Sequence, residues 1–260
     1  MKIPYFHVDA FASRQFAGNP AGVCLLEMWL GDSVLQQIAM EHNLSETAFI
    51  VRKADEWELR WFTPAVEVDL CGHATLAAGF VLMEIVRQAG RAVRFQSKSG
   101  TLRVERNEDL FVLDFPARPP VACSTPEALV QGLGRTPREV LKARDYLAVF
   151  DSEEAIRDLR IDLPALAQLD CLGIIATAPG READFVSRFF APRAGVAEDP
   201  VTGSAHCTLA PYWARRLSKT QMHAHQLSAR GGELFCEVRG ERVRIGGRAV
   251  LYLRGEIELA

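Results

Sequence analysis

Two stretches of this sequence combine residues that could move protons with residues that could bind an anion. The first, LCGHATLAAGF (70–80), places Cys71 and His73 on either side of Gly72. The second, PVTGSAHCTLAPYW (200–213), places Ser204 directly after Gly203 and then continues, like the first, into small residues. Taken alone, the first stretch fits a catalytic loop at a helix start, half of a metal site, or a tight turn between a strand and a helix. The choice depends on the elements around it.

The residues after each glycine predict a buried helix. ATLAAGFVLMEIV (74–86) is apolar on nearly every side, which is typical of a helix without an exposed face. We expect one helix from Gly72 to about Gln88 and a second over 204–217. Each helix start has unpaired backbone N–H groups and about half a positive charge, and a glycine there lets a ligand approach the backbone closely. The pattern therefore predicts that Gly72 and Gly203 bind a small carboxylate in one shared cleft.

An internal repeat supports two such helices. WFTPAVEVDLCGHATLAAGF (61–80) aligns with FFAPRAGVAEDPVTGSAHCTLAPYW (189–213), since both contain Phe-x-Pro and then Gly, a polar residue and Ala. Further on, QSKSGTLRVE (96–105) resembles LSARGGELFCEV (227–238). The matches share a nearly constant offset of about half the chain, which indicates two related lobes.

Periodicity predicts the elements around these helices. β-forming runs bounded by turn residues predict strands, and GDSVLQQIAMEHN (31–43) predicts a helix with Asp32 as its N-cap. The strands are expected at 5–11, 21–27, 47–52, 91–115, 170–178, 182–190 and 224–258. We predict an α+β fold of two pseudo-symmetric lobes, each a mostly antiparallel, β-barrel-like sheet around a central buried helix. The Pro-rich segment 116–140 sets the boundary, giving lobes 1–117 and 118–260.

Composition excludes several classes of partner. The 260 residues are 48% hydrophobic with a formal net charge of −3, so no basic field is available for nucleic acid or an anionic membrane. No apolar run is long enough to span a membrane, and Asp9 interrupts any signal-peptide pattern. The 6 cysteines are scattered without a Cys-x-x-Cys pair, which favours reduced thiols in a cytoplasmic protein.

Cofactor sites are also not expected. The glycines of RGGEL (230–234) lack the strand, Gly-x-Gly-x-x-Gly and helix context of a dinucleotide site. His223 and His225 share one face of a predicted strand, but the sequence offers no evident third ligand, so we expect a solvated surface there. No metal and no cofactor are predicted.

Five motifs resemble the PhzF phenazine-biosynthesis-like isomerase family, in order and over essentially the whole chain. They are FAGNPAGVCLL (16–26), EHNLSETAFI (41–50), FTPAVEVDLCGHATLAA (62–78), EDPVTGSAHCTLAPYW (198–213) and RGGELFCEV with VRIGGRAV (230–250). The resemblance implies the diaminopimelate epimerase fold, whose two pseudo-symmetric lobes agree with the repeat.

The resemblance also implies roles for individual residues. Glu46 would be the catalytic acid/base, and His73, Asp199 and Ser204 would hold the substrate and assist proton movement. Asn19 would be a further substrate contact. Epimerases of the wider superfamily use two facing cysteines. Here Cys71 stands at the first position, but the corresponding stretch of the second lobe, EDPVTGS (198–204), contains no cysteine, which favours the isomerase branch.

The surroundings of two residues predict how their pKa values shift. Glu46 enters the apolar run TAFIV, so we expect burial to raise its pKa toward the range of a general base. His73 follows a positive helix start, which should lower its pKa and favour neutral imidazole.

These observations predict a cofactor-independent isomerase that shifts a proton and a double bond in a small carboxylate-bearing metabolite. The helix starts at Gly72-His73 and Gly203-Ser204 would hold the carboxylate, and Glu46 would move the proton. The family resemblance implies a homodimer. Two alternatives remain open: a racemase or epimerase that uses Cys71, and a non-catalytic protein that binds small acids.

Overall fold

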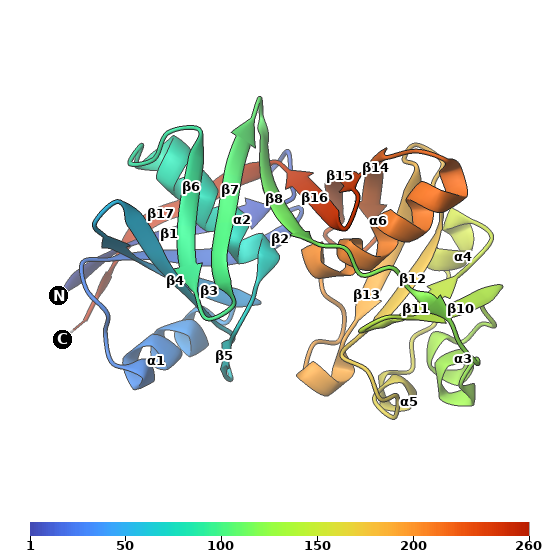
Figure 1. The fold of residues 1–260 in the computed structure, drawn as a ribbon. Coiled ribbons are helices and arrows are strands. Elements are labelled where there is room, and N and C mark those ends of the chain that lie inside the picture. Colours follow the sequence, from blue (N-terminus) through green and yellow to red (C-terminus); the bar gives the residue numbers. More distant parts are fainter. Residues whose placement is uncertain (260) are drawn as a thin grey trace. The chain divides into compact units, whose positions relative to one another are not determined.

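In the computed structural model, which describes residues 1–259, the chain folds into two compact units (Figure 1). Unit 1 contains Met1–Asp114 and the residues from Gly246 onward, and unit 2 contains Phe115–Ile245. The predicted division at 117/118 differs from this arrangement at the C-terminus. The last strand belongs to unit 1 because it pairs with the first strand, a contact between the two ends of the chain that local sequence patterns do not reveal.

Unit 1 is built on a mixed, mostly antiparallel ladder of strands. In order of pairing these are β17 (Ala249–Glu258), β1 (Lys2–Ala10), β2 (Asn19–Leu26), β3 (Glu46–Lys53), β4 (Glu56–Phe62), β6 (Ala92–Ser97), β7 (Gly100–Asn107) and β8 (Leu110–Pro116). Only β2–β3 and β4–β6 are parallel pairs. Helix α1 (Asp32–His42) lies between β2 and β3 in sequence. The short β5 (Glu67–Val68) and α2 (Gly72–Phe80) lie between β4 and β6, because two parallel strands require a crossover connection.

Unit 2 repeats this ladder. The strands are β9 (Val121–Ala122), β10 (Glu139–Lys142), β11 (Tyr146–Val149), β12 (Ile174–Pro179), β13 (Phe185–Phe190), β14 (Gln221–Gln226) and β15 (Gly232–Arg239), followed in sequence by β16 (Arg242–Gly247). Here β11–β12 and β13–β14 are the parallel pairs. The helices are α3 (Glu127–Leu133), α4 (Glu153–Arg157), α5 (Leu163–Leu166), the 3₁₀ turn η2 (Pro192–Ala194) and α6 (Gly203–Leu217).

The glycines of the sequence repeat mark equivalent element boundaries in the two units. Gly72 and Gly203 are the first residues of α2 and α6, the helices of the β4–β6 and β13–β14 crossovers. Gly100 and Gly232 are the first residues of β7 and β15. Each unit therefore carries one helix start at the same place in its own ladder, as the repeat predicts.

Helix α2 is buried on every side, as its composition predicts. All its residues from His73 to Phe80 are buried, and it packs against β1, β2, β3 and β7. The helix was predicted to reach about Gln88, but its α-helical part ends at Phe80. It continues as a π-helical turn, η1 (Val81–Ile85), which ends at Val86. The backbone N–H of Val86 donates to the carbonyl of Val81 over 2.9 Å, and Arg87 then turns out of the helix with φ 53°.

The start of α1 differs from the prediction. Asp32 is the first helical residue, and the N-cap is Gly31, whose extended backbone precedes the helix. The Asp32 carboxylate pairs instead with Arg60 of β4, with 2.9 Å between Oδ1 and Nη2. A residue that pairs across elements cannot be identified from the local capping pattern alone.

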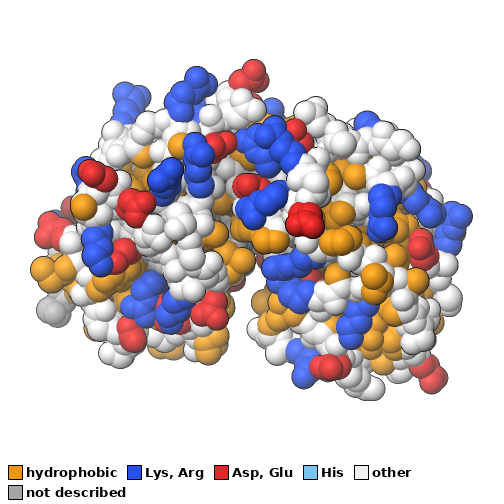
Figure 2. Space-filling view, viewed as in Figure 1, with side chains coloured by type: hydrophobic (Ala, Val, Ile, Leu, Met, Phe, Trp, Pro, Cys, Tyr) orange, Lys and Arg blue, Asp and Glu red, His pale blue; other side chains and the backbone are white. Residues whose placement is uncertain are grey.

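Side chains of both charges are interspersed on the face drawn in Figure 2, without a large area of one sign. Among the described residues, no helix has the length and apolar character needed to cross a membrane.

Candidate active site

Four residues of unit 1 lie together at the start of α2. Three of them are predicted site residues, and the fourth is the cysteine of the racemase alternative. Asn19 opens β2 and Glu46 opens β3, and these ends lie at one edge because the two strands are parallel, with Ala21 paired to Glu46. Cys71 is the extended N-cap residue of α2, and His73 lies in its first turn. The crossover therefore delivers the helix start to the edge at which both strands begin.

The imidazole of His73 is the centre of this group. Its Nε2 lies 3.1 Å from Oε2 of Glu46, and its Nδ1 lies 3.2 Å from the amide nitrogen of Asn19. The Sγ of Cys71 lies 3.5 Å from Nδ1. Both Asn19 and His73 are buried, whereas 20% of the Glu46 side chain is exposed. Glu46 is thus the member of the group that a ligand can reach.

The pKa values of Glu46 and His73 shift in the directions opposite to those predicted. Burial acts to raise the pKa of the Glu46 carboxyl, but the charge and hydrogen bond of His73, with a hydrogen bond from Cys71, outweigh it and lower this pKa. Burial acts to lower the pKa of His73, but the charges of Cys71 and Glu46 and their hydrogen bonds raise it well above its ordinary value. Both predictions were wrong because the sequence does not show that the two groups face each other.

At neutral pH the pair is therefore a carboxylate beside an imidazolium. Since burial raises the pKa of the Cys71 thiol to about 11, with the negative charge of Glu46 adding to it, the thiol is protonated and Glu46 is the effective charged partner of His73. An imidazolium donates from both ring nitrogens. In this state the Asn19 amide must present its oxygen to Nδ1, which means exchanging the places of its oxygen and nitrogen relative to the orientation given above.

The same group has a donor set that could hold a metal. Glu46, Cys71 and His73 each offer one ligand atom, and these atoms lie within 4.8 Å of one another. Carboxylate, thiolate and imidazole are ligands that Zn²⁺ accepts. Binding would require loss of the Cys71 proton, which the pKa of about 11 opposes.

The remaining predicted site residues belong to unit 2, at the start of α6. Gly203 is the first residue of that helix. Ser204 accepts a hydrogen bond of 3.1 Å from Nη2 of Arg144. The Oδ2 of Asp199 accepts a hydrogen bond of 2.5 Å from the hydroxyl of Thr202. Asp199 and Ser204 thus both have side-chain partners that hold them near the helix start.

Sequence reasoning missed two of these supporting residues. Gln226, the buried last residue of β14, accepts a 2.8 Å hydrogen bond from the Thr202 N–H and donates one of 2.7 Å to the Asp199 carbonyl. Arg144 is held against the fully buried Asp145, with 2.8 Å between Nη2 and Oδ2. Neither residue lies near the helix start in sequence, so only the parallel pairing of β13 with β14 could have suggested Gln226.

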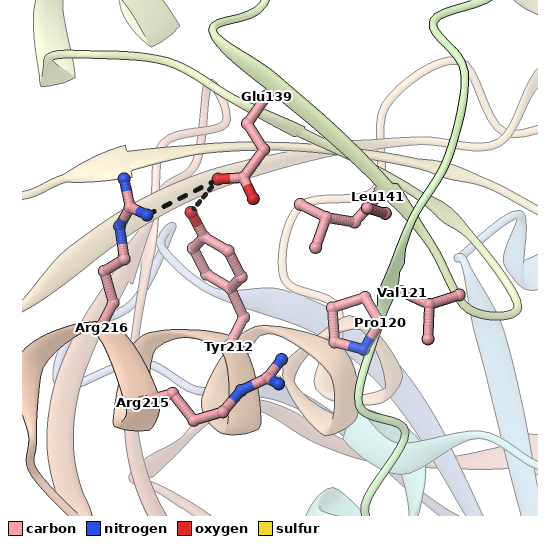
Figure 3. A pocket seen from close by; sticks show the side chains of 8 residues that line it. Pro120, Val121, Glu139, Leu141, Tyr212, Arg215 and Arg216 are labelled. Carbon is pink, nitrogen blue, oxygen red and sulfur yellow. Dashed lines mark hydrogen bonds and ion pairs between the residues drawn. The ribbon is translucent and has the colours of Figure 1, made fainter.

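A separate cavity of about 470 Å³ lies at the other end of α6 (Figure 3). The Tyr212 hydroxyl donates to Glu139 over 3.0 Å there, and Arg216 lies 3.8 Å from the same carboxylate. None of the predicted site residues lines it.

Comparison with known proteins identifies the family of this chain. A family model described as phenazine biosynthesis-like protein, PhzC-PhzF, matches residues 8–255. The chain belongs to the PhzF family. It is 56% identical to an uncharacterized isomerase of Pseudomonas aeruginosa, with 100% of both chains covered.

Solved structures show the same PhzF fold. A PhzF family protein of Enterococcus faecalis is 47% identical, with 100% of both chains covered and a TM-score of 0.98. A predicted epimerase of Pseudomonas aeruginosa shares the fold at 22% identity and a TM-score of 0.74, over 99% of this chain and 100% of that one. The predicted α+β fold of the epimerase type is thus confirmed, and the PhzF relatives include proteins that are named isomerases.

Proposed function

We propose that this PhzF family member is an isomerase that moves a proton, and with it a double bond, within a small carboxylate-bearing metabolite. The observation that carries the proposal is the Glu46–His73 pair: a partly exposed carboxylate, 3.1 Å from a buried imidazole with a raised pKa. A carboxylate in this state can accept a proton from an activated carbon, and the positive charge beside it favours developing negative charge in the substrate.

The proposed reaction balances without a redox partner or a cofactor. Glu46 removes a proton from a carbon next to an electron-withdrawing group, and the electron pair of that C–H bond delocalises as an enolate-like anion. The neutral Glu46 then returns the proton to a different carbon, so the double bond shifts and the carboxylate is regenerated. An anionic substrate brings negative charge and excludes water, and both effects raise the pKa of Glu46 toward that of an effective acid.

The helix starts provide the proposed binding contacts. The N–H groups at Gly72 and His73 suit the substrate carboxylate, since a helix N-terminus attracts negative charge. Gly203, Ser204 and Asp199 remain proposed contacts from unit 2, and Asn19 orients His73 from its far side. Variants of Gly203, Ser204 and Asp199 should raise KM more than they lower kcat.

A second candidate function, a racemase or epimerase, rests on the place of Cys71. Its sulfur lies 3.5 Å from Nδ1 of His73, in the same group as Glu46. Two properties favour the isomerase: the thiol pKa of about 11, and the absence of a cysteine from EDPVTGS (198–204), the stretch of the second lobe that corresponds to the one around Cys71. A thiol that stays protonated is a poor base for a C–H bond.

A substrate screen in heavy water separates the candidates. Purified protein is incubated with a panel of unsaturated and hydroxy-aromatic carboxylic acids and with amino acids, and products are analysed by NMR and chiral chromatography. The isomerase proposal predicts a constitutional isomer with deuterium at the new C–H position. Inversion at one carbon would instead support the racemase, and binding without conversion of any bound compound would support the binding protein.

The homodimer and the cytoplasmic location also remain proposals. In unit 1, the exposed aromatic rings of Phe16 and Tyr252 lie 5.6 Å apart, and Leu253, the next residue after Tyr252, is also exposed. An exposed apolar cluster of this kind supports self-association. Light scattering should give twice the 28.8 kDa chain mass, and a Phe16→Ser/Tyr252→Ser variant should lower it.

A further inference from the structure

Three side chains of the types that ligate metal ions lie on one face of the β14–β15 hairpin. None of them belongs to the residues of the proposed reaction. His223 and His225 are two positions apart on β14, so their side chains point to the same face. Glu233 of β15 is the register partner of His225. The ligand atoms of all three lie within 4.8 Å of one another, and Nε2 of His223 is 2.8 Å from Oε1 of Glu233.

We propose that His223, His225 and Glu233 form a binding site for one divalent first-row transition-metal ion, with Zn²⁺ as the best match. Bonds of about 2.0–2.2 Å at tetrahedral or octahedral angles place neighbouring ligand atoms roughly 3–3.5 Å apart. His223 Nε2 and Glu233 Oε1 are 2.8 Å apart and all three ligand atoms lie within 4.8 Å of one another, so side-chain rotations can bring the three to this spacing. Two imidazoles select a borderline ion over Mg²⁺ or Ca²⁺, which prefer oxygen ligands. All three residues are half-exposed, which leaves room for water as a further ligand.

The hairpin holds the histidines in place. The ring of His223 stacks on that of Phe235, with centroids 5.0 Å apart and planes at 18°. Its backbone N–H donates to Asp184 Oδ2 over 2.9 Å, and Asp184 is in turn paired with Lys219. The ring of His225 meets that of His223 edge-on, with centroids 4.7 Å apart. Supported ligands of this kind lose little freedom when an ion binds.

The charge around the hairpin also favours a cation. The carboxylates of Glu153 and Glu182 act electrostatically on His225, so they add negative potential near the site. The site is independent of Glu46, and the proposed isomerase reaction does not require it.

The test uses full-length protein without a histidine tag, stripped with a chelator and titrated with Zn²⁺ by calorimetry. Co²⁺ is added in parallel, because its visible d–d bands report ligand number. We expect a Zn²⁺ equivalent whose binding weakens at least about tenfold in His225→Ala and in Glu233→Gln, a change of about 1.4 kcal/mol or more. Circular dichroism checks that both variants fold.

Two matched variants separate this site from other carboxylates and histidines. Glu237→Gln changes a second carboxylate on β15 that pairs with Arg239, and it should bind Zn²⁺ like the wild type. His73→Ala removes a ligand of the Glu46–Cys71–His73 group, and it should keep the Zn²⁺ equivalent that His225→Ala weakens. No Zn²⁺ binding to the wild type, or binding that is unchanged in His225→Ala and Glu233→Gln, would overturn the proposal.

Discussion

At the scale of single residues, the charge state of the Glu46–His73 pair governs the pH dependence of the reaction. The working state needs Glu46 ionised and His73 protonated. The pKa of Glu46 is lowered below its ordinary 4.5, and that of His73 is raised well above 6.5. Activity should therefore be lost only as pH falls below the lowered pKa of Glu46 or rises above the raised pKa of His73, with a plateau across neutral pH.

The measurement is kcat/KM against pH, which reports the groups of the free enzyme. An acid limb centred near pH 6–7, where an unperturbed histidine titrates, would mean that His73 acts as neutral imidazole and that the ion pair is not the working state.

Cys71 supplies a second prediction at this scale. Cys71→Ser replaces a buried, protonated thiol by a smaller hydroxyl, so most activity should remain and the fold should persist, with only the modest cost of a near-isosteric core change. Turnover of the screened substrate and the unfolding midpoint are compared with the wild type. A loss of several orders of magnitude with the fold intact would favour the racemase.

The sequence predicts which residues gather better than it predicts their charge states. Glu46, His73 and Asn19 come together as the motifs suggest, because each lies at the first residues of a strand or helix whose start is recognisable. Their pKa directions depend on a contact between β3 and α2, which no local pattern encodes. The third ligand beside His223 and His225 was missed for the same reason, since Glu233 reaches them through strand register.

At the scale of elements, the tight packing of α2 gives a testable cost. A Cβ added at Gly79 would lie 2.8 Å from Cγ1 of Val104 on β7, closer than real contacts allow. Gly79→Ala gains about 1 kcal/mol of helix propensity but costs about 1–3 kcal/mol in overpacking, so we expect a net loss of about 1 kcal/mol of unfolding free energy.

Denaturant unfolding measures this change. Gly90→Ala is the control, since nothing lies within 4 Å of its added Cβ, and it should be neutral or slightly stabilising. In a double-mutant cycle, Val104→Ala should cost less in the Gly79→Ala background than in the wild type. Additive effects, or a stabilised Gly79→Ala, would show that α2 is less tightly packed against β7 than the structure indicates.

Element types followed from periodicity, whereas element ends depended on neighbours. The buried α2 and the start of α6 were predictable from apolar runs after glycines. Asp32 was misassigned as an N-cap because its carboxylate binds Arg60 of β4. The end of α2 was placed too late because the π-helical turn closes at Val86, which the apolar pattern does not distinguish from a continuing helix.

At the scale of the whole molecule, the first and last strands of the chain pair with each other within unit 1. β17 pairs with β1 from Lys2↔Glu258 to Ala10↔Ala249. A fragment of residues 1–117 lacks this strand and leaves β1 with an unpaired edge, so it should unfold without a cooperative transition or aggregate. The same fragment joined to 246–260 by a flexible linker should recover cooperative unfolding. A fragment 1–117 that unfolds cooperatively by itself would contradict the assignment of β17 to unit 1.

The central claim is that Glu46 carries the proton, and one measurement tests it most directly. Once the screen has identified a substrate, wild type and Glu46→Gln are compared in heavy water for turnover, ligand affinity and deuterium in the product. Glutamine keeps the shape and hydrogen bonding of Glu46 but cannot accept the proton, so turnover should fall by about 10²–10⁴ while affinity holds. Wild-type product should carry deuterium at the new C–H position, and the variant should yield neither product nor label. Near wild-type turnover by Glu46→Gln would contradict the account.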